Sequence, residues 1–141
     1  MRIVNKPSVL VCVTGQYDCD RLIRAGHKKA IATGRELHVL CVHSPMNDLS
    51  LLSQEIEYLY RTAKELGADM TVSFNASAPA FAADFARRMN VRQVITGIPD
   101  ERPNGFVLTL RELMPSLPIT MVTKEGEELI YSIEYSHKAL A

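Results

Sequence analysis

Several features that mark specialised protein classes are missing from this chain of 141 residues. Its three cysteines include no CxxC pair, which argues against a disulfide framework and suits a reducing cytoplasm. Its 16 basic and 16 acidic residues balance, so no overall charge attracts nucleic acid or an anionic membrane. No apolar run approaches the ~20 residues of a membrane span, and the amino-terminal segment shows no signal-peptide cleavage site. We therefore expect a cytoplasmic protein with no nucleic-acid and no membrane partner.

What is present indicates an ordinary globular protein. Hydrophobic residues make up 47% of the chain and charged residues 23%, a balance typical of folded domains. The length suffices for one domain that buries its core without disulfides or a metal. We expect an α/β domain over residues 1–123, followed by a carboxyl-terminal extension over residues 124–141 that forms a strand.

Two kinds of segment alternate along the chain. Strands are expected in five apolar runs: "SVLVCV" (8–13), "ELHVLCVH" (36–43), "DMTVSF" (69–74), "VRQVIT" (91–96) and "PITMVT" (118–123). Helical patterns separate them, and we expect Asp18 to cap the first helix and Gly34 to end it. This alternation predicts parallel βαβ units with right-handed crossovers, and therefore helices on both faces of one sheet.

The loops after the first and second expected strands carry candidate ligand residues. In a parallel sheet these loops share one rim with the loop after the fourth strand, and ligands bind there at a topological switch point. Thr14, Gly15 and Gln16 either face such a ligand or form a tight turn. Val42 and His43 reach the same rim at the end of the second strand.

Five stretches carry a resemblance to a known family: "SVLVCVTGQYDCDRLIRAGHKKA", "GRELHVLCVHS", "AKELGADMTV", "FARRMNVRQVITG" and "PSLPITMV". Their order and content resemble the universal stress protein family along residues 7–123. The likeness is closest to the universal-stress-like domain of potassium-sensing histidine kinases, in which the first strand runs into "RLIR" in a similar way. The resemblance implies a five-stranded parallel sheet of order 3-2-1-4-5, a homodimer and, in one branch of the family, bound ATP.

The resemblance also identifies the segment that would hold ATP, "GIPDERPNGF". ATP-binding members carry spaced glycines followed by Ser or Thr there, so that backbone N–H groups and a hydroxyl donate to the phosphates. Gly97 and Gly105 match the first and last glycine, but Asp100 replaces the middle glycine and Phe106 replaces the hydroxyl residue. The loop is also shorter than in the family. We therefore expect no tight ATP binding, and ATP or another adenine nucleotide is disfavoured as a cofactor.

Three functions remain open at this point. The first is a small-ligand-sensing or regulatory module of the universal stress type, working as a homodimer with a signalling-protein partner. The second is an adenine-nucleotide-binding protein with weak or no ATPase activity, and the third is a structural partner domain without a ligand. No enzyme activity is expected, because no Ser-His-Asp order or paired carboxylates stand out. No metal site is expected, because His38 and His43 fall on opposite faces of one strand.

The tail, "KEGEELIYSIEYSHKALA", lies beyond the resemblance. Leu129, Tyr131, Ile133 and Tyr135 occupy every second position, which is the period of a half-buried strand. Gly126 lies in a short turn before them, so the tail is expected to form a hairpin and run antiparallel to the fifth strand. The pairing would be within the chain or exchanged with the partner chain. Such a strand either covers the sheet edge or becomes the dimer contact.

Overall fold

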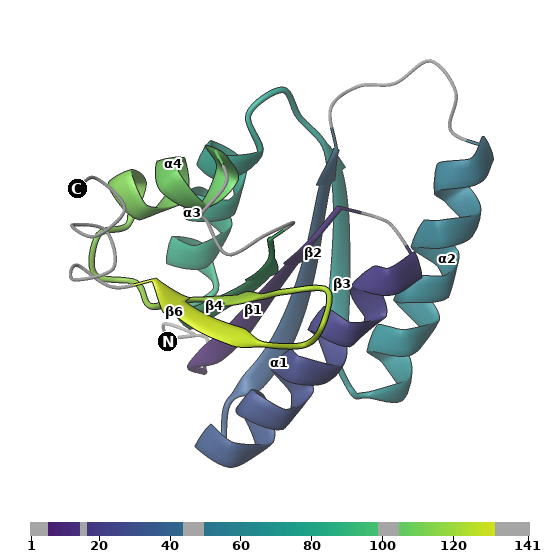
Figure 1. The fold of residues 1–141 in the computed structure, drawn as a ribbon, viewed down its shortest axis with the longest axis horizontal. Coiled ribbons are helices and arrows are strands. Elements are labelled where there is room, and N and C mark those ends of the chain that lie inside the picture. Colours follow the sequence, from purple (N-terminus) through teal and green to yellow (C-terminus); the bar gives the residue numbers. More distant parts are fainter. Residues whose placement is uncertain (1–5, 15–16, 44–49, 99–104, 132–141) are drawn as a thin grey trace, which may run out of the picture.

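A six-stranded sheet forms the centre of the computed structural model (Figure 1). The structure describes residues 6–14, 17–43, 50–98 and 105–131. The strands are β1 Ser8–Val13, β2 Glu36–His43, β3 Asp69–Phe74, β4 Val91–Gly97, β5 Ile119–Val122 and β6 Glu128–Tyr131. Their order is β3-β2-β1-β4-β5-β6; β1 to β5 are parallel, and β6 is antiparallel to β5. The predicted fold class and strand order are thereby confirmed.

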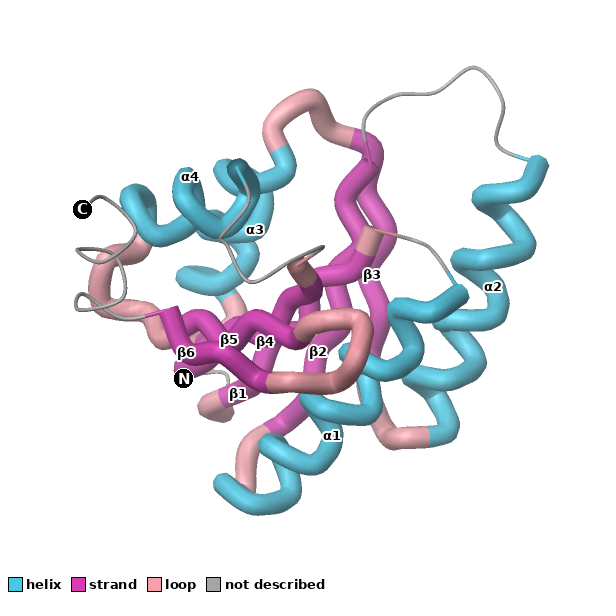
Figure 2. Tube along the Cα trace, viewed as in Figure 1, coloured by secondary structure: helices cyan, strands magenta, loops and turns pink. Residues whose placement is uncertain are grey.

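Helices connect the parallel strands. They are the short 3-10 helix η1 Tyr17–Cys19 and the α-helices α1 Asp20–Thr33, α2 Ser50–Glu65, α3 Ala78–Arg88 and α4 Gly105–Leu113. In Figure 2, α1 and α2 lie on one face of the sheet, and α3 and α4 lie on the other. Right-handed crossovers require this arrangement for the observed strand order. None of these described helices is both long and apolar enough to cross a membrane.

The central strand β1 contributes to the packing on both faces of the sheet. Leu10 and Cys12 pack with residues of α3 and α4, whereas Val9, Val11 and Val13 pack with residues of α1 and α2. All five side chains are buried. A continuous apolar run is typical of a parallel strand that is covered on both faces. This packing holds the carboxyl end of β1, where the candidate site lies, in a rigid frame.

The two ends of α1 differ in how well the sequence predicted them. Gly34 ends the helix in the left-handed conformation with φ +66°, as expected. Asp18, however, does not cap it, because Asp18 lies inside η1 and α1 begins after Cys19, which makes no side-chain cap. The Asp18 carboxylate instead lies 3.7 Å from Nη1 of Arg21. This ion pair offers the carboxylate a partner other than the backbone N–H groups of the helix.

The predicted tail strand exists and pairs with β5 of the same chain. Gly126 has φ +89° in the connecting turn, where its N–H donates to the carbonyl of Thr123 at 2.9 Å. On β6, Tyr131 is buried and Leu129 packs against the core beneath α3 and α4. Their inward direction confirms the predicted alternation for this part of the tail. The later positions of the predicted alternation, 133 and 135, lie outside the described residues.

Candidate functional site

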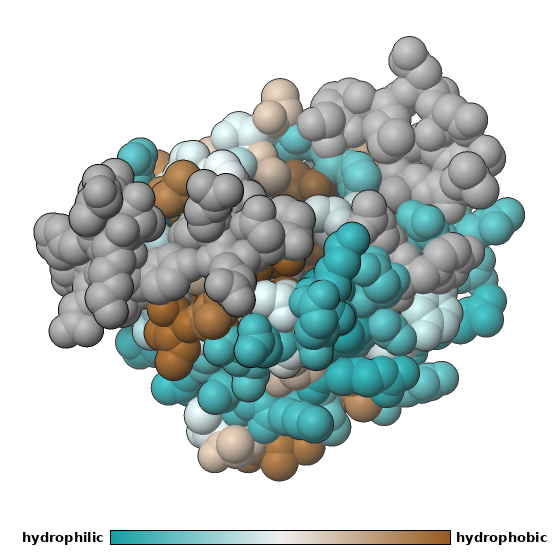
Figure 3. Space-filling view, in the orientation of Figure 1, coloured by the Kyte–Doolittle hydropathy of each residue, from teal (hydrophilic) through white to brown (hydrophobic). Residues whose placement is uncertain are grey.

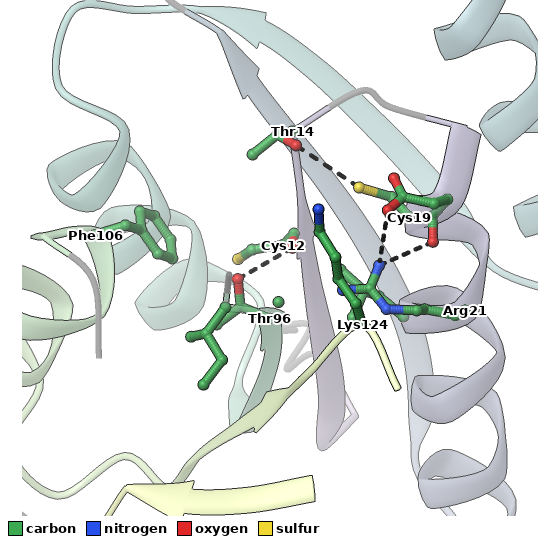
Figure 4. A pocket seen from close by; sticks show the side chains of 11 residues that line it. Cys12, Thr14, Cys19, Arg21, Thr96, Phe106 and Lys124 are labelled. Carbon is green, nitrogen blue, oxygen red and sulfur yellow. Dashed lines mark hydrogen bonds and ion pairs between the residues drawn. The ribbon is translucent and has the colours of Figure 1, made fainter. Parts of the chain in front are cut away.

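The carboxyl ends of β1 and β4 form the switch point of this sheet. After β1 the chain moves toward β2 on one face, and after β4 it moves toward β5 on the other, so the loops diverge. A cavity of about 320 Å³ opens there (Figure 4). It is lined by Cys12, Thr14, Asp18, Cys19, Arg21, Leu22, Thr96, Gly97, Ile98, Phe106 and Lys124.

Charged side chains from α1 and from the turn after β5 line one side of this cavity. The Arg21 guanidinium donates from Nε to the carbonyl of Thr123 at 3.2 Å and from Nη1 to the carbonyl of Asp18 at 2.9 Å. Lys124 is exposed and lies beside it (Figure 4). The cavity lining thus contains two cations and one carboxylate, that of Asp18. This half of the site favours an anionic group.

A second, apolar cavity of about 160 Å³ adjoins the first. It extends beneath α3 and is lined by Cys12, Val13, Thr14, Leu40, Val42, Ala78, Ala82, Thr96 and Phe106. Four residues line both cavities: Cys12, Thr14, Thr96 and Phe106. The switch point therefore combines an apolar slot with a cation-lined chamber, a combination typical of small-molecule sites.

The floor between the two cavities is made by β1 and β4. The Thr96 hydroxyl donates to the carbonyl of Cys12 at 3.3 Å, which ties the two strand ends together. Burial, and secondarily the neighbouring Cys41, raises the pKa of the Cys12 thiol to about 12. A thiol that stays protonated at neutral pH is a poor nucleophile. Cys12 therefore acts as an apolar wall.

Three of the seven predicted site residues line the two cavities. Thr14 lines both cavities, Val42 lines the apolar slot, and Gly97 lines the cationic chamber. His43 lines neither cavity, but its Nε2 hydrogen-bonds with the carbonyl of Thr14 and so holds the end of β1 to β2. Gly105 begins α4 and lines neither cavity.

Two further predicted residues, Gly15 and Gln16, lie outside the described residues, as does the segment 99–104 with its acidic side chains.

Gly97 has a steric reason to lack a side chain. A Cβ placed there would lie 3.2 Å from Nη2 of Arg21 and 3.3 Å from Cδ1 of Leu22. The close approach of α1 to β4 therefore brings Arg21 to the cavity.

The sequence alone did not single out Arg21 or Lys124, because each resembles an ordinary surface cation in its own segment. The position of Arg21, near the start of the helix that follows the first strand, is the signal that could have identified it.

The two histidines of β2 do not form a joint site. His38 is buried, and its ring lies edge-on to Phe85 of α3 with centroids 6.2 Å apart. His43 instead bonds at the rim, as described above. Among the described residues no group of three His, Cys, Asp or Glu side chains is placed to hold a metal ion.

No protein-family model and no curated protein sequence matches the chain. Solved structures do match. A universal stress protein from Archaeoglobus fulgidus is 16% identical with a TM-score of 0.63, covering 84% of this chain and 98% of that one. A universal stress protein in complex with cAMP is 11% identical with a TM-score of 0.64, covering 86% and 99%. The Archaeoglobus fulgidus protein in complex with dAMP is 15% identical with a TM-score of 0.56, covering 82% and 95%. The chain therefore has the fold of the universal stress proteins.

Proposed function

We propose that this chain is a regulatory module that binds a small molecule at the carboxyl ends of β1 and β4. One observation carries the proposal: an apolar slot and a cation-lined chamber adjoin through the shared side chains of Cys12, Thr14, Thr96 and Phe106. Such a site suits a ligand with a flat apolar ring and one anionic group. A nucleoside monophosphate has this form, and universal stress proteins of the same fold are known in complex with cAMP and with dAMP.

The residues of this site favour a monophosphate over a triphosphate. Phe106 stands where ATP-binding members of the family have a hydroxyl, so it supplies an apolar wall and no hydrogen-bond donor. Arg21 and Lys124 outnumber the single carboxylate of the lining, that of Asp18, by one positive charge, which suits one phosphate group better than three. A triphosphate carries more negative charge than these two cations offset.

The proposed regulation works through the two segments that meet at the cavity. Arg21 belongs to α1, and Lys124 belongs to the turn between β5 and β6. A ligand whose anionic group lies between them would favour the arrangement of α1 and the hairpin that suits it best, which is a population shift. We propose that the module acts in the cytoplasm as a homodimer with a signalling-protein partner.

Calorimetric titration of the purified protein with AMP, cAMP, adenosine and ATP tests the proposal. We expect dissociation constants in the tens of micromolar, about −6 kcal/mol, for AMP or cAMP, and at least about tenfold weaker binding of ATP. Lys124→Gln should weaken AMP binding several-fold without changing adenosine binding, since it removes one charge at the anionic end. Lys6→Gln, an exposed cation outside the cavity, is the matched control.

Absence of binding by every one of these compounds would favour the structural domain without a ligand. Tighter binding of ATP than of AMP would instead favour the adenine-nucleotide-binding protein of the ATPase type.

A further inference from the structure

A groove of about 460 Å³ lies between α1 and the β5–β6 hairpin. It is lined by Arg21, Arg24, Ala25, Lys28, Lys29, Ala32, Val122, Gly126 and Glu128. Figure 1 shows the hairpin running alongside α1, with β6 at the edge of the sheet. Apart from Arg21, none of these residues lines the ligand cavity. The groove is therefore a separate surface that shares one side chain with the candidate site.

Positive charge is concentrated along the α1 wall of this groove. Four of the nine lining residues are Arg or Lys, and one, Glu128, is acidic. Within the described part of the chain neither Lys28 nor Lys29 has an ion-pair partner, and Arg24 approaches Asp20 only to 4.0 Å. The whole chain has no net charge, so this wall is a local excess of cations. It attracts negative charge from a partner.

The spacing of the cations suits an extended chain. Arg21, Arg24 and Lys28 are three and four residues apart on α1, which corresponds to about 4.5–6 Å along the helix axis. Alternate residues of an extended strand are about 6.6 Å apart and lie on the same side. The wall from Arg21 to Ala32 spans about 16 Å, enough for about five extended residues. Ala25 lies between the cations and Ala32 lies beyond Lys29, and these two small side chains leave room for a backbone.

The opposite wall offers apolar contact. Leu129 and Tyr131 point into the core. Glu128 and Ile130, which alternate with them along β6, therefore lie together on the opposite face of the strand. Ile130 does not line the groove itself but lies on the same face of β6 as Glu128, which does; it is 66% exposed, although isoleucine is among the residues most often buried. Val122 of β5 adds an apolar floor. Figure 3 shows a hydrophobic patch over β6 beside the hydrophilic surface of α1.

We propose that this groove binds an extended acidic segment of a partner protein. Carboxylates at alternate positions of the segment face Arg24 and Lys28, and Lys29 adds positive charge beside Lys28. The apolar side chains between the carboxylates face the hairpin with Val122 and Ile130. The charge of the wall, its spacing and the exposed apolar residue opposite it all fit this one occupant. A nucleic acid fits less well, because the lining holds no aromatic side chain on which a base could stack.

Fluorescence anisotropy with a labelled nine-residue peptide of alternating Glu and Val tests the proposal on the full chain. The comparison peptide has Gln in place of each Glu. The double variant Lys28→Gln with Lys29→Gln should weaken binding of the Glu peptide at least tenfold. The control double variant, Lys6→Gln with Lys64→Gln, removes the same charge from exposed positions outside the groove and should leave binding unchanged. Ile130→Thr should weaken binding of the same peptide by a factor that does not depend on salt.

A melting curve of each variant checks that the fold is intact. If the Lys28 and Lys29 variant melts lower, Arg24→Gln with Lys28→Gln repeats the measurement at two exposed positions. Three results would overturn the proposal: equal weakening by the control variant, equal binding of the Gln peptide, or tighter binding of a single-stranded oligonucleotide of the same charge. Because adenine nucleotides bind elsewhere, the calorimetric result for the ligand cavity neither supports nor weakens this inference.

Discussion

Two neighbouring residues of β6 are placed in opposite environments. Tyr131 is 4% exposed and lies beneath α4, where the Arg111 guanidinium is 5.8 Å from the centre of its ring. Ile130, on the other face of the same strand, is 66% exposed. On the α3–α4 side, the sheet is therefore covered as far as β6, the last described strand. On the α1–α2 side, β6 is exposed to solvent. The comparison indicates that the closed face stabilises the hairpin, and that the open face is available for partners.

Removing the hairpin is expected to have the largest effect. Deletion of residues 125–141 takes away β6 with its buried Tyr131, exposes the edge of β5 and removes the proposed dimer contact. We expect the proposed dimer to dissociate and the melting temperature to fall, measured by light scattering and circular dichroism. Deletion of residues 132–141 alone keeps β6 and is the control. An unchanged dimer of unchanged stability after the longer deletion would show that the hairpin is dispensable.

Single substitutions on β6 compare its two faces directly. Tyr131→Ala should lower the free energy of unfolding by about 3 kcal/mol, because it empties a buried site in the core. Ile130→Ala, one residue away and exposed, should change it by less than about 0.5 kcal/mol. Urea denaturation of both variants measures the difference. Similar losses from the two substitutions would mean that β6 is covered on both faces in solution.

The reactivity of the cysteines tests whether the α1–α2 face of the sheet is accessible to solvent only above the hairpin. Burial, and to a lesser extent the nearby Cys19, raises the pKa of the Cys41 thiol to about 12. Burial is also the main reason why the pKa of Cys12 is raised. Cys12 packs toward α3 and α4, and Cys41 packs toward α1 and α2. We expect neither thiol to react with a disulfide reagent at pH 8 until urea unfolds the chain. Fast reaction of Cys41 alone would show that the α1–α2 face is open over β2 as well.

The same thiols give a pH dependence. Their folded pKa values lie above the ordinary value of 9.0, so the unfolded chain releases these protons first as the pH rises. The contribution of these two thiols to the free energy of unfolding should therefore be constant below about pH 9 and fall between pH 9 and 12. Lysines and tyrosines also titrate there, so the control is the double variant Cys12→Ala with Cys41→Ala. Its free energy of unfolding should fall less steeply than that of the unsubstituted protein.

The smallest expected effects are at the two glycines of the switch point. Neither Gly97 nor Gly105 has a positive φ, so backbone strain is not expected at either. Gly97→Ala should cost about 1 kcal/mol and weaken AMP binding, because the new Cβ crowds Arg21 and Leu22. Gly105→Ala meets no atom within 4 Å and should stabilise the start of α4 by a few tenths of a kcal/mol without changing binding. Calorimetry and urea denaturation measure both quantities, and a reversed ranking of the two variants would contradict this account.

Periodicity and turn residues predicted the elements well, because these signals are local. Val9 and Val11 alternate with Leu10 within a run that has to be covered on both faces, and the structure covers it. Prediction failed where a local signal had a competitor. Asp18 has the chemistry of an N-cap, but Arg21, three residues later, offers its carboxylate an ion pair and η1 forms instead. His43, a candidate ligand residue at the rim, hydrogen-bonds with the carbonyl of Thr14 at the end of β1, a contact that its sequence position did not reveal.

The sequence by itself determined the strands, the helices and the turns, since glycines such as Gly34 and Gly126 act on their immediate neighbours through the left-handed conformation. Only the tertiary structure decided what meets at the switch point. Arg21 bonds to the carbonyl of Thr123, 102 residues away, and Phe106 reaches both cavities from a helix on the opposite face of the sheet. Contacts of such sequence separation depend on which strands become neighbours. No local pattern in this chain encodes that pairing, because one apolar strand resembles another until the packing of the helices distinguishes them.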